Sequence, residues 1–277
     1  MKIFVINMDK SVDRWKRISK ELDGLDFHRF PAIEGKKLSQ TEIDTNTTFL
    51  SRTFICTYGS LGCALSHINL WRQIADSDQD FACIAEDDAT FTKDFKKVLG
   101  DIPSIYSKTD FDIINLYSDF LTSGSTIYAN KSYKVEKPRF ALSMCCYVIS
   151  KKGAKALAEL SKKVLVPIDI QVALLNFNGL IKQCVLYSPK VAQPSLEEST
   201  INKFNTGGIL NRIISILPGS NAYKKFSSIN LINFNLKYTI TSYIAILIFL
   251  ALLSLSKKWY ILFVIIVVEI LMVLINF

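Results

Sequence analysis

Three consecutive carboxylates, Glu86, Asp87 and Asp88, directly follow an apolar run in the segment FACIAEDDAT. The run FACIA is short and apolar, which predicts a fully buried β-strand. Ligands of open α/β sheets bind beyond the carboxyl ends of the strands, so these carboxylates lie where a site is expected. Residues two apart point the same way in an extended chain, so Glu86 and Asp88 can face one ligand while Asp87 turns aside to its neighbours.

Carboxylates this close repel each other unless a cation lies between them. A hard divalent ion, Mn²⁺ or Mg²⁺, prefers carboxylate oxygens and keeps open positions for phosphate groups. The chain has only two histidines, His28 and His67, which excludes a histidine-rich zinc site and leaves oxygen as the main ligand. The alternative interpretation is a solvated acidic turn that caps the next helix, predicted in DATFTKDFKKVL.

The composition and the motifs limit the chemistry. A net charge of +8 favours an anionic partner, which could be nucleic acid, a lipid surface or a phosphorylated small molecule. The sequence has no GxxxxGKS/T loop and no GxGxxG after a strand, which argues against a nucleoside triphosphatase or a dinucleotide dehydrogenase. The six cysteines form no CxxC pair, so we interpret them as reduced core residues.

The elements that position the carboxylates alternate along the chain. We predict strands in IFVINM, FHRFPAI, FACIA, FDIINLY, CCYVIS and IKQCVLY, and helices in DKSVDRWKRISKEL, GSLGCALSHINLWRQIADS and KKGAKALAELSKK. This alternation predicts an α/β fold with a doubly wound, mostly parallel sheet. Residues 121–138 are rich in Ser, Thr and Tyr, and we expect a hairpin or a flexible loop there.

The C-terminal part has a different character. Residues 188–237 are rich in Asn and Ser and predict a linker that can lie on a membrane surface. Residues 238–256 carry no charge, and a second apolar run continues to Phe277, broken only by Glu269. Each run is close to the ~20 residues that span a bilayer. We therefore predict a C-terminal hydrophobic helical tail, as one span, a hairpin or a span with a second, interfacial segment.

Charges next to the tail predict its orientation. Lys224, Lys225 and Lys237 precede the first apolar run, and the positive-inside tendency then leaves the preceding chain on the cytoplasmic side. The N-terminal run MKIFVINMDK has too short an apolar stretch for a signal peptide. We expect localisation at the inner (cytoplasmic) membrane, with the catalytic domain facing the cytoplasm.

Five segments, in their order and spacing, resemble glycosyltransferase family 25, the bacterial lipopolysaccharide and lipooligosaccharide glycosyltransferases: FVINMDKSVDR, GSLGCALSHINLW, FACIAEDDA, SMCCYVISKKGAKAL and VPIDIQV. The similarity spans about residues 1–195, with VAQPS near its end. The expected domains are a glycosyltransferase domain at 1–195, a linker at 196–237 and a transmembrane or membrane-inserted segment at 238–277.

The resemblance implies a glycosyltransferase A-type, Rossmann-like fold and a divalent metal, Mn²⁺ or Mg²⁺. It also implies a UDP-sugar donor, most often UDP-galactose, and transfer with inversion to a sugar of the lipopolysaccharide core. A β-1,4-galactosyltransferase is the specific activity considered, and UDP-glucose is the alternative donor. The expected partners are the donor, a lipid-linked oligosaccharide acceptor and the inner membrane, and no nucleic acid.

The metal motif of the family corresponds here to Glu86, Asp87 and Asp88. We assign Asp88 as the metal ligand and Glu86 as metal-supporting or ribose-binding, because a cation that bridges the diphosphate and the protein lowers the barrier to loss of UDP. Asp87 is expected to contact the donor.

An inverting transfer also needs a base for the proton of the acceptor hydroxyl. Asp169 in VPIDI is our candidate for the catalytic base. Its alternative role is helix N-capping after Pro167, and Asp112 and Asp119 remain alternative bases.

Four further residues are expected to bind the donor nucleotide. Asn7 and Arg14 flank the first strand-to-helix turn, where Arg14 can pair with the diphosphate or only cover the first helix. Ser66 and His67 lie on the helix that leads to the acidic strand, and the resemblance gives both a donor role. A lone histidine at helical spacing is otherwise a hydrogen-bonded packing residue.

Two other classes compete with the transferase hypothesis. A non-catalytic, membrane-anchored scaffold that binds carbohydrate or phosphate would keep the fold without the reaction. A metal-dependent glycoside or phosphoester hydrolase would use similar carboxylates. Three carboxylates together with Asp169 favour the transferase, because a binding module does not need both a metal site and a base.

Overall fold

The computed structural model describes residues 1–49, 51–118, 120–121, 124–187 and 191–195, which all belong to one compact unit, Met1–Arg212. The predicted linker and membrane segments, and the second unit Ile213–Phe277, lie outside these residues. Within the described ranges, no helix combines the length and the apolar character needed to cross a membrane. The tail therefore stays a prediction.

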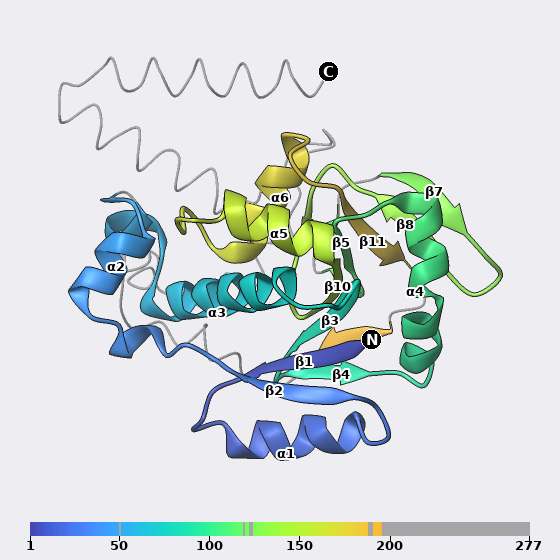
Figure 1. Cartoon of the computed structure of the whole chain (residues 1–277), viewed down its shortest axis with the longest axis horizontal. Helices are drawn as coiled ribbons and strands as arrows, with labels where there is room; N and C mark the ends of the chain where they lie inside the picture. The colour runs from blue at the N-terminus through green and yellow to red at the C-terminus, as the bar shows by residue number, and fades with distance from the viewer. Residues whose placement is uncertain (50, 119, 122–123, 188–190, 196–277) are drawn as a thin grey trace, which may run out of the picture. The chain divides into compact units, whose positions relative to one another are not determined.

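An eight-stranded sheet runs through the described part of the chain in the order β2-β1-β3-β10-β5-β11-β8-β7 (Figure 1). Its strands are β1 (Lys2–Asn7), β2 (Phe27–Pro31), β3 (Phe81–Glu86), β5 (Ile113–Asn115), β7 (Ser125–Ala129), β8 (Lys134–Lys137), β10 (Cys146–Ser150) and β11 (Gln183–Tyr187). Two small pairs accompany it, β4 (Ala89–Phe91) with β12 (Ala192–Pro194) and β6 (Phe120–Leu121) with β9 (Ala141–Leu142).

The sheet is mixed, which corrects the prediction of a mostly parallel sheet. Strands β2, β1 and β3 pair in parallel, and so do β5 and β11. Strand β10 is antiparallel to both β3 and β5, and β8 is antiparallel to β11 and β7. The reason is that no helix crosses over between β5 and β10. The described chain there forms short strands and the hairpin β7–β8, so it re-enters the sheet in the opposite direction.

Helices cover both faces of the sheet (Figure 1). Side chains of α1 (Val12–Glu21) and α4 (Phe95–Thr109) pack with Cys83 and Ala85 of β3 in one core. Side chains of α3 (Tyr58–Ala75), α5 (Lys151–Leu160) and α6 (Ile168–Phe177) pack with Ala82 and Ile84 in the other. Alternate residues of β3 therefore face α1 and α3, as the period of two in a strand requires.

The helix α3 starts at a capping box in which the Thr57 and Ser60 side chains bond each other's backbone N–H groups. Three short elements precede α3 in chain order: a 3₁₀ turn, Gly35–Lys37, the helix α2 (Gln40–Asn46) and a π-helical turn, Ser51–Ile55. A Cβ on Gly62 would overlap the carbonyl oxygen of Ile33, so only glycine permits this close approach of α3 to the segment after β2.

Candidate active site

The three carboxylates after β3 point toward different helices. Glu86 lies two residues after Ile84, so its side chain is on the same face of the strand and points toward α3. Asp87 follows the alternation of Cys83 and points to the other face, toward α1. The chain then enters β4 at Ala89, and the next helix begins only at Phe95, after the N-cap Asp94. The acidic residues are therefore not the cap of that helix, which removes the alternative interpretation.

Asp87 is the anchor of the acidic turn on the α1 side. Its Oδ2 accepts a 2.7 Å hydrogen bond from Nδ2 of Asn7, and its Oδ1 forms a 3.1 Å ion pair with Nη1 of Arg14. Nη2 of Arg17 donates to its carbonyl oxygen at 2.8 Å. Nε of Arg29 in turn donates to Oδ1 of Asn7 at 2.7 Å. The expected contacts Asn7, Arg14 and Asp87 thus form one hydrogen-bonded group, in which Asp87 turns to protein neighbours as predicted.

Glu86 is held from the α3 side. Its Oε1 lies 3.4 Å from Nε2 of His67 and accepts a 3.6 Å hydrogen bond from Sγ of Cys63. The His67 side chain is fully buried, and its Nδ1 lies 2.8 Å from the hydroxyl oxygen of Tyr147. The same oxygen accepts a 2.8 Å hydrogen bond from Nε1 of Trp71. The Tyr147 oxygen can accept a second hydrogen bond or donate its own proton, so it is a suitable partner for either tautomer of His67.

These neighbours keep Glu86 ionised despite its burial. Burial raises the pKa of its carboxyl, but the hydrogen bond and the electrostatic attraction of His67 oppose that effect. The Cys63 hydrogen bond and the charge of Arg14 add to the opposition, and the pKa of Glu86 lies below its ordinary value. Glu86 therefore offers a charged oxygen at the carboxyl end of β3.

The side chain of Asp88 differs from those of Glu86 and Asp87 in its hydrogen bonding. Its Oδ1 is buried and has no hydrogen-bond partner among the described residues. Burial, followed by the charges of Glu86 and Asp87, raises the pKa of its carboxyl from 3.8 to about 6. A buried carboxylate oxygen without a partner is costly, and a divalent cation is the partner that would satisfy it. Hard oxygen donors from Asp88 and Glu86 fit the Mn²⁺ or Mg²⁺ that the motif implies.

Asp169, at the start of α6, acts electrostatically on Cys63 of α3. It lies in the first turn of that helix, where its Oδ1 accepts a 2.9 Å hydrogen bond from the N–H of Ile170. Burial and the charge of Glu86 raise the pKa of the Cys63 thiol well above its ordinary value. The charges of Asp169 and Asp88 act on this thiol in the same direction, so these carboxylates lie within electrostatic range of one atom.

Of the two alternative bases, the structure describes only Asp112. Asp112 lies at the amino end of β5, whereas the acidic turn follows the carboxyl end of β3, which runs in the same direction; its Oδ2 accepts a hydrogen bond from the N–H of Lys182 at 2.8 Å. Asp119 lies outside the described residues.

Ser66 and His67 are held by hydrogen bonds to other parts of the protein, and their donor role stays a prediction. Ser66 is fully buried, and its hydroxyl donates to the Gly62 carbonyl at 2.7 Å and accepts from the N–H of Ile33 at 2.8 Å. The structure does not bring it to the carboxylates. His67 lies behind Glu86 and contacts that residue, so its place is that of a positioning group.

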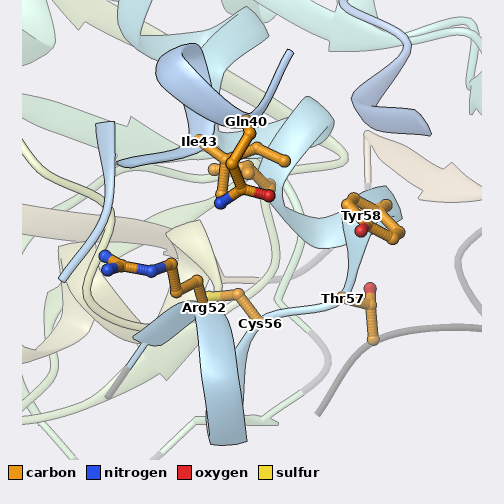
Figure 2. Close-up of a pocket in the computed structure, with 7 residues that line it drawn as sticks. Gln40, Ile43, Arg52, Cys56, Thr57 and Tyr58 are labelled. Atoms are coloured by element: carbon orange, nitrogen blue, oxygen red, sulfur yellow. The ribbon is translucent and has the colours of Figure 1, made fainter. Parts of the chain in front are cut away.

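A hollow of about 260 Å³ lies at the start of α3 (Figure 2). Gln40 and Ile43 of α2 face Arg52 and Cys56 across it, with Thr57 and Tyr58 to one side. The Tyr58 side chain is partly exposed. The hollow is lined by polar, aromatic and aliphatic side chains.

Sequence reasoning missed four residues that shape the site: Cys63, Arg17, Arg29 and Tyr147. A signal was present for Cys63, because Cys63 and His67 are four apart on a predicted helix and share one face. Arg17 follows Arg14 by three residues on the first helix and shares its face for the same reason. Nothing in the sequence connected Arg29 or Tyr147 to this site.

Sequence comparison provides independent information. A family profile described as "Glycosyltransferase family 25 (LPS biosynthesis protein)" matches residues 1–172. A protein of Anopheles gambiae described as "Glycosyltransferase 25 family member" is 31% identical over 183 residues, covering 60% of this chain and 30% of the relative. "Procollagen galactosyltransferase 1-A" of Xenopus laevis is 27% identical over 196 residues, covering 60% and 30%. The chain therefore spans under a third of these animal relatives.

A bacterial protein of Haemophilus influenzae is 28% identical over 187 residues, covering 64% of this chain and 63% of the relative. Among solved structures, S. aureus TarS 1-349 in complex with UDP-GlcNAc aligns with a TM-score of 0.36 and 8% identity, covering 72% of this chain and 59% of that chain. A TM-score this low does not establish a shared fold.

Proposed function

The chain belongs to glycosyltransferase family 25, and on this premise we propose that it transfers a sugar from a UDP-sugar to a lipopolysaccharide or lipooligosaccharide core acceptor. The resemblance predicted from the motifs is confirmed by the family match. We further propose a glycosyltransferase A-type fold. The parallel strands β2, β1 and β3 are neighbours in a Rossmann-like arrangement, and the acidic motif follows the carboxyl end of β3.

The buried Oδ1 of Asp88, which has no hydrogen-bond partner in the described part of the chain, is the observation that carries this proposal. A binding scaffold gains nothing from such a carboxylate next to Glu86, because it costs stability without a cation. A divalent cation, when bound by Asp88 and Glu86, supplies positive charge that stabilises the diphosphate leaving group. We propose Mn²⁺ or Mg²⁺ in this role, since both prefer oxygen ligands.

The remaining residues contact either the donor or the acceptor. We assign Asn7, Arg14 and Asp87 to the wall of the donor site, where Arg14 offsets the charge of Asp87 and so reduces its repulsion of a diphosphate. We assign the base to Asp169. In the inverting step the acceptor oxygen bonds to the anomeric carbon, the bond to the UDP oxygen breaks, and Asp169 takes the hydroxyl proton.

We propose galactose as the transferred sugar, with glucose as the alternative. The name of the Xenopus laevis relative, a procollagen galactosyltransferase, supports galactose. The linkage proposed from the sequence, β-1,4, has no further support from the structure.

We propose that the acceptor sugar binds in the hollow between α2 and the start of α3. Tyr58 offers a ring for a sugar face, and Gln40 and Thr57 offer polar groups. Tyr58 starts the helix that carries Cys63 further along, and Cys63 contacts the proposed metal ligand Glu86. The lipid-linked acceptor and the apolar C-terminal sequence together support our proposal of action at the cytoplasmic face of the inner membrane.

The experiment is UDP release by the purified chain from UDP-galactose, UDP-glucose and UDP-N-acetylglucosamine, with Mn²⁺ or with EDTA. Each reaction runs with and without a truncated lipooligosaccharide acceptor. We expect release from UDP-galactose that needs both metal and acceptor. Release that needs no acceptor indicates a hydrolase. No release from folded protein with any donor and acceptor contradicts the proposal and favours the binding scaffold.

A further inference from the structure

Cys63, His67 and Glu86 form a cluster of three different metal-binding side chains on the α3 side of the site. One potential ligand atom from each lies within 4.8 Å of the other two. Two of the separations are 3.4 Å, from Nε2 of His67 to Oε1 of Glu86, and 3.6 Å, from Sγ of Cys63 to the same oxygen. This cluster is distinct in chemistry from the carboxylates, because it contains a thiol and an imidazole.

The spacing matches a tetrahedral centre. Zinc binds thiolate sulfur at about 2.3 Å, imidazole nitrogen at about 2.0 Å and carboxylate oxygen at about 2.0–2.2 Å. In a tetrahedron these bond lengths place neighbouring ligand atoms about 3.3–3.6 Å apart. The two separations measured at Glu86 already lie in that range, so the ligands need little movement to accept an ion.

We propose that Cys63, His67 and Glu86 bind a thiophilic divalent cation such as Zn²⁺, at a site separate from the hard-cation ligand Asp88. Three protein ligands leave a fourth position for water. Coordination replaces the thiol proton, which leaves to solvent. The proposal concerns binding of the ion alone and does not rest on the sugar-transfer activity.

The surrounding structure holds these ligands in place. Cys63 and His67 lie one helical turn apart on α3, and Glu86 ends β3, so two rigid elements carry the three ligands. Tyr147 contacts Nδ1 of His67 at 2.8 Å, which supplies the outer partner that metal-binding imidazoles generally have. The side chain of Glu86 is 27% exposed, which gives the ion a path from solvent.

Ligand softness separates the two sites. Mn²⁺ and Mg²⁺ favour oxygen, whereas Zn²⁺ and Co²⁺ accept sulfur and nitrogen. Glu86 touches both groups of ligands, so a thiophilic ion on Cys63 and His67 would occupy an oxygen that the hard cation also uses.

The test uses Co²⁺ alone as the probe, because thiolate-bound cobalt gives a near-ultraviolet charge-transfer band that nitrogen and oxygen ligands do not give. The whole chain is titrated with Co²⁺ and then with Zn²⁺ in competition with a chelating dye. We expect the band in the unchanged protein, its displacement by Zn²⁺, and its loss in Cys63→Ser. The Zn²⁺ dissociation constant should rise in Cys63→Ser by more than about tenfold, since loss of an outer partner alone costs 10–100-fold.

Two control variants keep the result interpretable. Cys56→Ser replaces another buried thiol, bonded to Ser51 on the nearby loop, and should keep the band. Asp88→Asn should lose Mn²⁺ binding and keep the band. Absence of the band in the folded, unchanged protein, its persistence in Cys63→Ser, or its loss in Cys56→Ser or Asp88→Asn would overturn the assignment. Unfolding temperatures of all variants show that each is folded.

Discussion

Asn7, the last residue of β1, donates a 2.7 Å hydrogen bond to the carboxylate of Asp87, the first residue after β3. Strands β1 and β3 are parallel neighbours with Ile6 opposite Glu86, so the bond joins the carboxyl ends of the two strands. It fixes the acidic turn on the α1 side and leaves Glu86 and Asp88 to the other side. The relationship therefore sets the geometry of the proposed site.

Replacing Asn7 by alanine should destabilise the fold. Asn7 is 1% exposed, and its loss removes one partner from Asp87 and one from Nε of Arg29. Unsatisfied buried polar groups cost about 1–3 kcal/mol each, more for charged ones, so we expect the free energy of unfolding to fall by about 2–4 kcal/mol. Chemical denaturation measures this change. Asn178→Ala is the control, because Asn178 is exposed and its side chain bonds, among the described residues, only the Leu174 carbonyl; an equal loss in both variants would contradict the account.

Replacing Asp88 by asparagine should stabilise the metal-free protein. The pKa of the folded-state carboxyl is raised to about 6, so folding disfavours the charged form. The cost is absent below the ordinary pKa of 3.8 and grows as the pH rises from there to about 6. At neutral pH with EDTA we expect Asp88→Asn to raise the free energy of unfolding by up to about 3 kcal/mol.

The same comparison at about pH 4 provides the control, because the carboxyl is then mostly protonated in the folded protein. The two proteins should differ little there. An Asp88→Asn variant that is less stable than the unchanged protein at neutral pH would show that the carboxylate has protein partners and would contradict the cation site.

Replacing Asp169 by asparagine should remove turnover while preserving donor binding. A general base contributes about 10²–10⁴-fold, so we expect the rate constant kcat to fall by at least about 100-fold. The affinity for UDP with Mn²⁺ should change little, because Asp169 is assigned to the acceptor side. Asp112→Asn is the matched control, since the new side chain can still accept the bond from the N–H of Lys182 at the amino end of β5. Equal losses of turnover in the two variants would remove Asp169 as the base.

Replacing Tyr58 by alanine tests the proposed acceptor hollow. We expect the KM for the acceptor to rise by about tenfold or more, because full burial of a large apolar side chain contributes about 1.5–3 kcal/mol. The KM for the UDP-sugar should stay within about twofold. Phe177→Ala, at the end of α6, is the control. It removes an aromatic ring of similar exposure, 37% against 39% for Tyr58, from a position that does not line the hollow. An unchanged acceptor KM in Tyr58→Ala would place the acceptor elsewhere.

The acidic strand could be predicted because its signals are local. FACIA is apolar throughout, which is typical of a buried strand, and the three carboxylates after it mark the end of that strand. The alternation of residues also predicted correctly that Asp87 would turn away from its two neighbours. Which helix lies on each side could not be read from the strand itself.

The direction of β10 could not be predicted in the same way. Its residues CYVIS are fully buried, and a continuous apolar run does not indicate whether a strand is parallel or antiparallel to its neighbours. Direction depends on the connection before it, where the sequence has no helix pattern. The role of Cys63 was missed for a related reason, since a thiol among apolar helix residues resembles a core residue. Only the packing of α3 against the end of β3 brings it to Glu86.

The affinity for UDP, measured by calorimetry with Mn²⁺ and with EDTA, tests the central claim most directly. The proposed site predicts that Mn²⁺ strengthens UDP binding by at least about tenfold in the unchanged chain, because the cation joins the diphosphate to Asp88. In Asp88→Asn that gain should disappear, while weak metal-free binding remains. A gain from Mn²⁺ that is equal in both proteins, or no gain in either, would contradict the assignment of the acidic turn as the donor and metal site.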